Sequence, residues 1–266
     1  MKIIVCVKQV PDTSGKVAVN PDGTLNRASM QTITNPDDMN AVEAALKLKD
    51  ETGCEVVVVT MGPPPAAGML RELMAMGADR GVLVSAREFG GSDTSATSQI
   101  LAAAVSTIGI EDDDIVMCGR QAIDGDTAQV GPQIAEKLHL PQITYAAEIT
   151  KEGKTVTVKR MLEDGYMTIK TQTPCLLTCI KELNNPRYMS IGGIYATYEK
   201  PLDVYDYEKL KDHPLIDATT IGLKGSPTNI FKSFTPPQKG VGVMLEGDGK
   251  ETCEKLVGIL TAKHII

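Results

Sequence analysis

The sequence predicts an α/β fold: a doubly wound, mostly parallel sheet with an antiparallel extension and a C-terminal partner-binding arm. Three observations support this fold class. Short apolar runs alternate with helical patterns up to about residue 140, strand-like segments follow Pro141, and residues 202–238 are polar and interrupted by prolines. We therefore expect an α/β domain at residues 1–200 and an extended arm with a short helix at residues 201–266.

Four apolar runs in the first part are typical of buried parallel strands, which carry hydrophobic side chains on both faces. They lie at residues 3–7, 56–61, 81–84 and 115–118, and a helical pattern follows each of them. Asn35 as a cap and Pro36 in the first turn predict the start of the first helix. Gly77 predicts the end of the second helix, and Ser92 or Asp93 predicts the start of the third.

The other expected elements are a hairpin, an extension of the sheet and a last helix. Residues 17–25 contain an Asn-Pro-Asp-Gly turn between two short strand patterns. Strand patterns at 143–149, 155–160, 166–170 and 174–179 predict antiparallel strands that extend the sheet. Residues 251–263 predict a short amphipathic helix, whose apolar face a partner subunit would cover.

Composition disfavours several classes of protein. The chain has 266 residues, and its net charge of −7 without basic blocks argues against nucleic-acid binding. No apolar run reaches the ~18 residues of a membrane span. Three widely separated histidines disfavour a His-based metal site or a Ser-His-Asp triad. Six cysteines without a CxxC pair, and an N-terminus without signal-peptide features, indicate a reduced, cytoplasmic protein.

The segment after the fourth strand carries the strongest functional signal, because doubly wound sheets bind ligands beyond the carboxyl ends of their strands. Gly119 leaves the strand, Gly125 allows a tight turn, and Gly131 allows close approach to the first turn of the next helix. Asp126 or Thr127 is expected to cap that helix. Its free N–H groups form an anion site suited to a pyrophosphate. An ordinary capped helix explains the spacing equally well.

The other strand ends are compatible with the same ligand. Cys6 ends the first strand, Met61 and Gly62 leave the second, and residues 35–38 offer a helix N-terminus. Together they describe a crevice for an adenine nucleotide. The sequence has no G-x-G-x-x-G after the first strand and no G-x-x-x-x-G-K-[ST], which disfavours a common NAD dehydrogenase and a P-loop NTPase.

Several motifs resemble the β subunit of electron transfer flavoproteins. They are Cys-Gly-Arg-Gln-Ala-Ile-Asp at 118–124, Met-Gly-Ala-Asp-Arg-Gly at 76–81, Asn-Pro at 35–36, Leu-Asn-Asn-Pro-Arg-Tyr at 183–188, and the pattern of 158–165 that continues to 174–178. The family usually has Glu or Gln where this chain has Met167. The resemblance covers residues 1 to about 200, and the C-terminal arm fits it in kind.

The resemblance implies a heterodimer with an electron transfer flavoprotein α subunit that carries one FAD. The β subunit holds a second nucleotide, which is AMP in the respiratory type and FAD in the electron-bifurcating type. Small residues at positions 125, 128 and 131 leave room for a full FAD. Thr127 and Gln129 are expected to hold the pyrophosphate, and Asp124 or Asp126 to hold a ribose or cap the helix. The candidate cofactor-binding residues are Cys6, Asn35, Pro36, Asp37, Asp38, Met61, Gly62, Gly119, Arg120, Gln121, Ala122, Ile123, Asp124, Gly125, Asp126, Thr127, Ala128, Gln129, Val130 and Gly131.

For the bifurcating type, the resemblance implies that NADH gives a hydride to the β-site FAD. One electron then passes to ferredoxin or flavodoxin, and the other passes through the α-subunit FAD to an acyl-CoA dehydrogenase that docks on residues 183–191. The flavin supplies the chemistry, so no side chain is expected to be catalytic. One alternative is a one-electron carrier with structural AMP. Another, of a different class, is a regulatory module that binds ATP or AMP.

Overall fold

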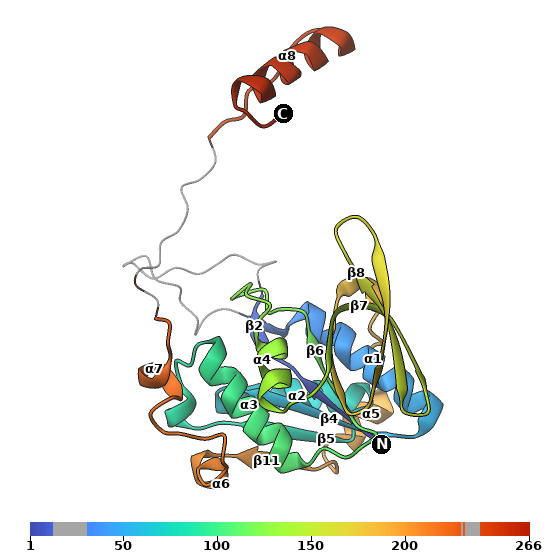
Figure 1. Cartoon of the computed structure of the whole chain (residues 1–266), viewed down its shortest axis with the longest axis vertical. Helices are drawn as coiled ribbons and strands as arrows, with labels where there is room; N and C mark the ends of the chain where they lie inside the picture. The colour runs from blue at the N-terminus through green and yellow to red at the C-terminus, as the bar shows by residue number, and fades with distance from the viewer. Residues whose placement is uncertain (13–30, 230, 232–239) are drawn as a thin grey trace.

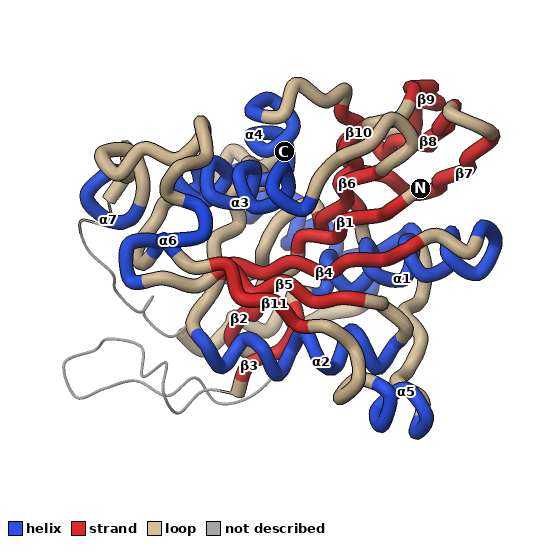
Figure 2. Tube along the Cα trace, turned by 90° about the horizontal axis from the view of Figure 1, so that it is seen from below, coloured by secondary structure: helices blue, strands red, loops and turns tan. Residues whose placement is uncertain are grey.

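The computed structural model describes residues 1–12, 31–229, 231 and 240–266. The hairpin predicted at residues 17–25 lies outside them. In the part of the chain that is described, the fold is α/β, as predicted, and centres on a sheet of nine strands in the order β11-β5-β4-β1-β6-β10-β7-β8-β9 (Figure 1 and Figure 2). Pairing is parallel from β11 to β7 and antiparallel from β7 to β9.

The first half of the chain alternates strands and helices, as its apolar pattern predicts. Gly53 and Gly77 end the first two helices with positive φ, a backbone conformation that glycine adopts readily. Asp93 caps the third by accepting the N–H of Ala96 at 3.0 Å. The elements are β1 (Lys2–Cys6), β2 (Gln9–Pro11), β3 (Thr32–Thr34), α1 (Pro36–Thr52), β4 (Glu55–Met61), η2 (Pro64–Ala66), α2 (Ala67–Met76), β5 (Arg80–Val84), η3 (Arg87–Phe89), α3 (Thr94–Ile108), β6 (Ile115–Gly119) and α4 (Val130–Lys137).

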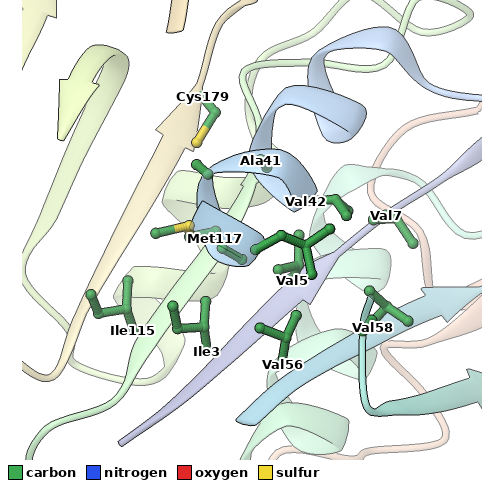
Figure 3. Close-up of a cluster of buried hydrophobic side chains, with 14 of the residues drawn as sticks. Ile3, Val5, Val7, Ala41, Val42, Val56, Val58, Ile115, Met117 and Cys179 are labelled. Atoms are coloured by element: carbon green, nitrogen blue, oxygen red, sulfur yellow. The ribbon is translucent and has the colours of Figure 1, made fainter. Parts of the chain in front are cut away.

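Helices cover both faces of the parallel strands, because alternate residues of a strand point to opposite faces. Ile3 and Val5 of β1 pack with Val42 of α1 in one buried cluster (Figure 3). Ile4 of β1 packs with Ile100 of α3 in the other. The chain proceeds from β1 to β4 on one side and reaches β6 on the other, so the strand order reverses between β1 and β6. Their carboxyl ends therefore form the switch point at which doubly wound folds bind ligands.

The strands after Pro141 agree only partly with the prediction. β7 (Gln142–Glu152), β8 (Thr155–Met161) and β9 (Tyr166–Gln172) form the expected antiparallel extension. The prediction for β10 (Cys175–Cys179) is wrong, because this strand lies between β6 and β7 and runs parallel to both. All of its residues are buried, and such an unbroken buried run is typical of a central parallel strand.

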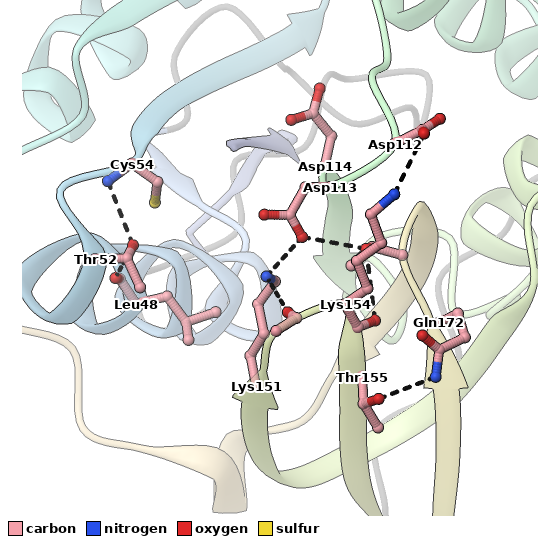
Figure 4. Close-up of polar contacts among 12 residues, drawn as sticks. Leu48, Thr52, Cys54, Asp112, Asp113, Asp114, Lys151, Lys154, Thr155 and Gln172 are labelled. Carbon is pink, nitrogen blue, oxygen red and sulfur yellow. Dashed lines mark hydrogen bonds and ion pairs between the residues drawn. The ribbon is translucent and has the colours of Figure 1, made fainter.

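Charged contacts fasten the antiparallel extension to the segment before β6. The Lys151 ammonium donates to the Asp113 carboxylate at 2.7 Å, and Lys154 pairs with Asp112 at 3.3 Å (Figure 4). The hydroxyl of Thr173 donates to the same Asp113 carboxylate at 3.2 Å. These contacts lie at the amino edge of the sheet, so they leave the opposite edge free for a ligand.

The C-terminal part begins inside the domain. The expectation of an extended segment from residue 202 is wrong at its start, because β11 (Leu202–Tyr205) joins the sheet edge parallel to β5. Leu210 and Ile221 beyond it are buried in the core. The short helices here are η4 (Lys181–Leu183), α5 (Ile191–Ala196), α6 (Tyr207–Leu210) and α7 (Gly222–Gly225). The last helix forms as predicted: α8 (Gly249–Ala262) has no buried residue and stands apart from the sheet in Figure 1.

Candidate functional site

Two strand ends and one helix start meet at the switch point. The carboxyl ends of β1 and β6 are neighbours, with Cys6 and Cys118 in register. The first turn of α1 packs against Gly119, where a Cβ would lie 2.7 Å from backbone atoms of Asp37 and Asp38. Only glycine fits between this helix and the strand. The largely exposed loop of residues 120–129 starts here and leads to α4.

Asn35 holds this loop instead of capping α1. Its side-chain amide donates to the carbonyl of Gln121 at 2.8 Å and accepts the N–H of Ile123 at 3.1 Å. The predicted side-chain cap is therefore wrong, since no such bond forms at the start of α1. The physical reason is that one amide satisfies a donor and an acceptor of the loop backbone at once, and Asn35 is completely buried.

Asp38 joins the two strand ends. Its carboxylate accepts the N–H of Lys8 at 2.8 Å and the N–H of Gly119 at 2.8 Å. Burial raises the pKa of this carboxyl to about 7, although both N–H groups favour the charged form. Its neighbour Asp37 lies 3.3 Å from the Arg120 guanidinium; burial raises the pKa of Asp37, and Arg120 opposes that rise.

Lys8 is a site residue that the candidate list lacks. Its ammonium contacts both carboxylate oxygens of Asp124, at 2.7 and 2.8 Å, and so ties the middle of the loop to the end of β1. A signal for it exists in the sequence: Lys8 is the first charge after a central strand, and an acidic loop follows the neighbouring strand. The side chain of Gln121 donates to Asp126 within the same loop.

The expected cap of α4 is also wrong. The helix begins at Val130, and neither Asp126 nor Thr127 caps it, because Gln129 occupies the capping position without a side-chain bond. Asp126 and Ala128 both have φ of 53°. Within the described residues, the N–H groups of Thr127, Ala128 and Gln129 have no acceptor. Together with the first turn of α4, they form a row of donors that suits an anion.

The glycines at positions 125 and 131 differ in how closely other atoms surround them. A Cβ at Gly131 would lie 2.7 Å from the sulfur of Cys118, so glycine at this position lets α4 pack closely on the sheet. That Gly131 also leaves room for a cofactor stays a prediction. Gly125 has no left-handed φ, and among the described residues no atom beyond its chain neighbours lies within 4 Å of such a Cβ. The described part of the chain therefore does not require glycine at position 125.

The predicted residues of β1 and β4 are mainly packing residues. The Cys6 thiol is buried beside Val59 and Cys118 in the core, and burial raises its pKa to about 12. Met61 packs against the same cluster, and the N–H of Gly62 donates to the carbonyl of Val84 at 3.1 Å. The structure thus brings residues 35–38 and 119–124 together directly, with these residues beneath them.

The segment after η4 is fastened to α1, with its apolar side chains pointing outward. Asn40 and Asn184 exchange hydrogen bonds at 2.7 to 3.0 Å. The Arg187 guanidinium binds the buried carboxylate of Glu43 at 2.9 and 3.1 Å and Asp50 at 2.7 Å. The exposed surface over this segment and α5, called the docking patch below, consists of Tyr188, Met189, Ile191, Ile194, Tyr195 and Tyr198.

A metal-binding cluster and a membrane-spanning helix are both absent from the described residues, 1–12, 31–229, 231 and 240–266. No group of three or more His, Cys, Asp or Glu side chains there is arranged to bind a metal ion. In the same residues, no helix combines the length and apolar character needed to cross a bilayer.

The fold and the loop at its switch point define a doubly wound α/β protein with a candidate anion site at its strand ends. The family described as "Electron transfer flavoprotein domain" matches residues 22–209. The chain is 71% identical to the acryloyl-CoA reductase electron transfer subunit gamma of Anaerotignum propionicum, over 100% of both chains. It is 52% identical to the caffeyl-CoA reductase-Etf complex subunit CarD of Acetobacterium woodii and 47% identical to an electron transfer flavoprotein subunit beta of Clostridium acetobutylicum, again over 100% of each chain. The chain belongs to the electron transfer flavoprotein family, and its resemblance to the β subunits is confirmed.

Proposed function

We propose that this electron transfer flavoprotein β subunit is of the bifurcating type and binds FAD at the carboxyl ends of its strands. The observation that carries the proposal is the loop of residues 120–129. This loop sits at the switch point and is held from α1 and β1, and ahead of α4 it presents three N–H groups that have no acceptor among the described residues. A pyrophosphate needs such a row of donors at a helix N-terminus.

Different residues of the loop would bind different parts of the nucleotide. The N–H groups of Thr127, Ala128 and Gln129 and the first turn of α4 would hold the pyrophosphate. The Gln129 side chain is already oriented, because its amide oxygen Oε1 accepts a hydrogen bond from the Thr94 hydroxyl at 3.1 Å. Asp124 or Asp126 would hold a ribose, and Lys8 limits the repulsion between Asp124 and the phosphates.

Gly125 and Ala128 support FAD rather than AMP as the occupant. Gly125 is exposed and Ala128 is half-buried, and in the described residues no atom beyond its chain neighbours lies within 4 Å of a Cβ placed at Gly125. No side chain of this chain has to act as a general acid or base. When bound, the flavin supplies the redox chemistry, accepting hydride from NADH and passing electrons to ferredoxin or flavodoxin and, through the α-subunit FAD, to an acyl-CoA dehydrogenase.

Two apolar surfaces supply the contacts with partners. The docking patch suits the acyl-CoA dehydrogenase, because its tyrosines and isoleucines are exposed while Arg187 keeps their backbone fixed. α8 suits the α subunit, because Leu256, Val257 and Ile259 remain exposed on it. Two relatives support such an assembly, since their names describe them as subunits of acryloyl-CoA and caffeyl-CoA reductase complexes.

The decisive experiment is to purify the complex with its α subunit and identify its nucleotides after acid extraction. Two FAD per heterodimer, with direct bleaching of the flavin by NADH, is the expected result. One FAD plus one AMP, without bleaching, would establish the AMP-containing carrier instead. A colourless protein that remains monomeric in the presence of candidate α subunits would contradict both and favour the regulatory module.

A further inference from the structure

We propose that Asp38 is the positioning residue of the nucleotide site, through which the first turn of α1 sets the shape of the loop at residues 120–129. This inference rests on the proposed function and adds to it how the loop is held. Asp38 is 6% exposed, and its two carboxylate oxygens are used by N–H groups of the protein. It therefore acts through backbone rather than by touching the ligand.

The two N–H groups that Asp38 accepts belong to the two strands that border the switch point. One is the N–H of Lys8, two residues after the end of β1, and the other is the N–H of Gly119, the last residue of β6. No other hydrogen bond involving a side chain joins these two strand ends to one group among the described residues. A single carboxylate thus links Lys8 to Gly119, just beyond Cys6 and Cys118, the last residues of β1 and β6 that pair with each other in the sheet.

Both anchored residues are connected to the loop, Gly119 through the chain and Lys8 through its side chain. Gly119 is followed by Arg120, whose N–H donates to the carbonyl of Cys179 at 2.7 Å. The ammonium of Lys8 donates a hydrogen bond to Asp124 in the middle of the loop. Asn35, one turn before Asp38, holds Gln121 and Ile123. The start of α1 consequently controls the loop at its first residue and at three later positions.

The charge of Asp38 is not balanced by an ion pair in the described residues. Lys8 and Arg120, the cations on the two strand ends, pair with Asp124 and Asp37 instead. The titratable and charged groups facing Asp38 or its neighbour Asp37 are Asp37 on α1, Cys6 and Lys8 at β1, Cys118 and Arg120 at β6, Cys179 on β10 and Glu182 on η4. Burial and the nearby Asp37 raise the pKa of Asp38 to about 7. The carboxylate that accepts two N–H groups is therefore lost on mild acidification.

Asp38→Asn is the sharpest variant, because it keeps the shape and removes one acceptor. An asparagine oxygen can accept one of the two N–H groups, but its amide nitrogen then faces the other donor. Asp114→Asn is the matched control. Asp114 is 1% exposed and accepts the N–H groups of Lys2 at 2.6 Å and Glu111 at 2.9 Å, at the amino ends of the same two strands.

The experiment titrates the full chain with FAD and with AMP, by calorimetry, between pH 6 and pH 8. For the wild type, affinity should rise with pH through about 7, as Asp38 ionises. Asp38→Asn should weaken binding by about ten- to a hundredfold at the upper end of the range and abolish the pH dependence. Asp114→Asn should lower the unfolding temperature but change affinity by less than about twofold, since distant sites act independently.

Amide hydrogen exchange of the unliganded chain gives a second readout. Asp38→Asn should accelerate exchange at Lys8, at Gly119 and across residues 120–124, and Asp114→Asn should not. Equal affinity, an unchanged pH profile and unchanged exchange in Asp38→Asn would overturn the positioning role. If the wild type binds neither FAD nor AMP, the proposed function fails, and exchange at residues 119–124 still decides whether Asp38 positions the loop.

Discussion

Asp38 and Asp114 are buried carboxylates at opposite ends of the β1–β6 pair. Each accepts two backbone N–H groups, but Asp114 also has the Lys2 ammonium at 3.2 Å, whereas Asp38 has no cationic partner in the described residues. At the amino edge, the charge and the hydrogen-bonding capacity of the buried carboxylate are therefore both matched by partners. The carboxyl edge keeps an unbalanced charge beside an exposed loop, and such local conflicts are typical of functional sites.

The largest expected effect lies at the amino edge. Asp114→Ala leaves the N–H groups of Lys2 and Glu111 without their acceptor, and it should lower the free energy of unfolding by about 4 kcal/mol. Urea denaturation measures this loss. Asp112→Ala is the control, because its contact with Lys154 is exposed and should matter by less than about 1 kcal/mol. If both variants lose the same small amount of unfolding free energy, Asp114 is not the structural contact that distinguishes the amino edge from the carboxyl edge.

The next effect is the pH dependence of stability at the carboxyl edge. Because burial raises the pKa of Asp38 from 3.8 to about 7, its contribution to stability is complete below about pH 3.8 and is lost as pH rises through 7. The wild type should therefore lose about 3 kcal/mol relative to Asp38→Asn between pH 5 and pH 8. Urea unfolding of both proteins across this range measures the difference. A difference in unfolding free energy between the two proteins that stays the same from pH 5 to pH 8 would show that Asp38 has an ordinary pKa.

A smaller loss of stability is expected from a substitution where α1 packs against β6. In Gly119→Ala the new methyl group would lie 2.7 Å from the backbone of Asp37 and Asp38, so helix and strand must separate. We expect a loss of about 2 kcal/mol in unfolding free energy. Gly165→Ala is the control, because a Cβ there meets no neighbour. If both variants are as stable as the wild type, the close contact between α1 and the strand end does not exist.

The smallest expected effect concerns the ligand rather than the protein. If the open space beside Gly125 takes the part of FAD that AMP lacks, as the proposed function requires, Gly125→Asn should weaken FAD binding about tenfold while AMP binding changes by less than about twofold. Calorimetry with each nucleotide measures the ratio, and Gly165→Asn serves as the control. An equal loss for both nucleotides would mean that position 125 does not select for size.

The sequence predicts the layered fold and the location of the site, because apolar periodicity and strand ends are local features. The orientation of β10 differs from the prediction although its unbroken apolar run at residues 175–179 is typical of a central parallel strand, because the antiparallel strands just before it in the chain suggest a continuation of the same pattern. Asn35 has the signature of a helix cap, but its partners Gln121 and Ile123 lie more than eighty residues away. Asp38 likewise looks like an ordinary first-turn acid. Contacts of such long range decide what these residues do, and one sequence does not show them.

The proposed function requires that the loop of residues 120–129 binds the diphosphate of a nucleotide. The most direct test follows the backbone amide signals of the full chain by NMR during titration with FAD. The account predicts the largest shifts at Thr127, Ala128, Gln129 and Val130, with smaller ones at Gly119 and Lys8. Saturable binding that shifts amides elsewhere and leaves residues 119–131 unchanged would contradict it.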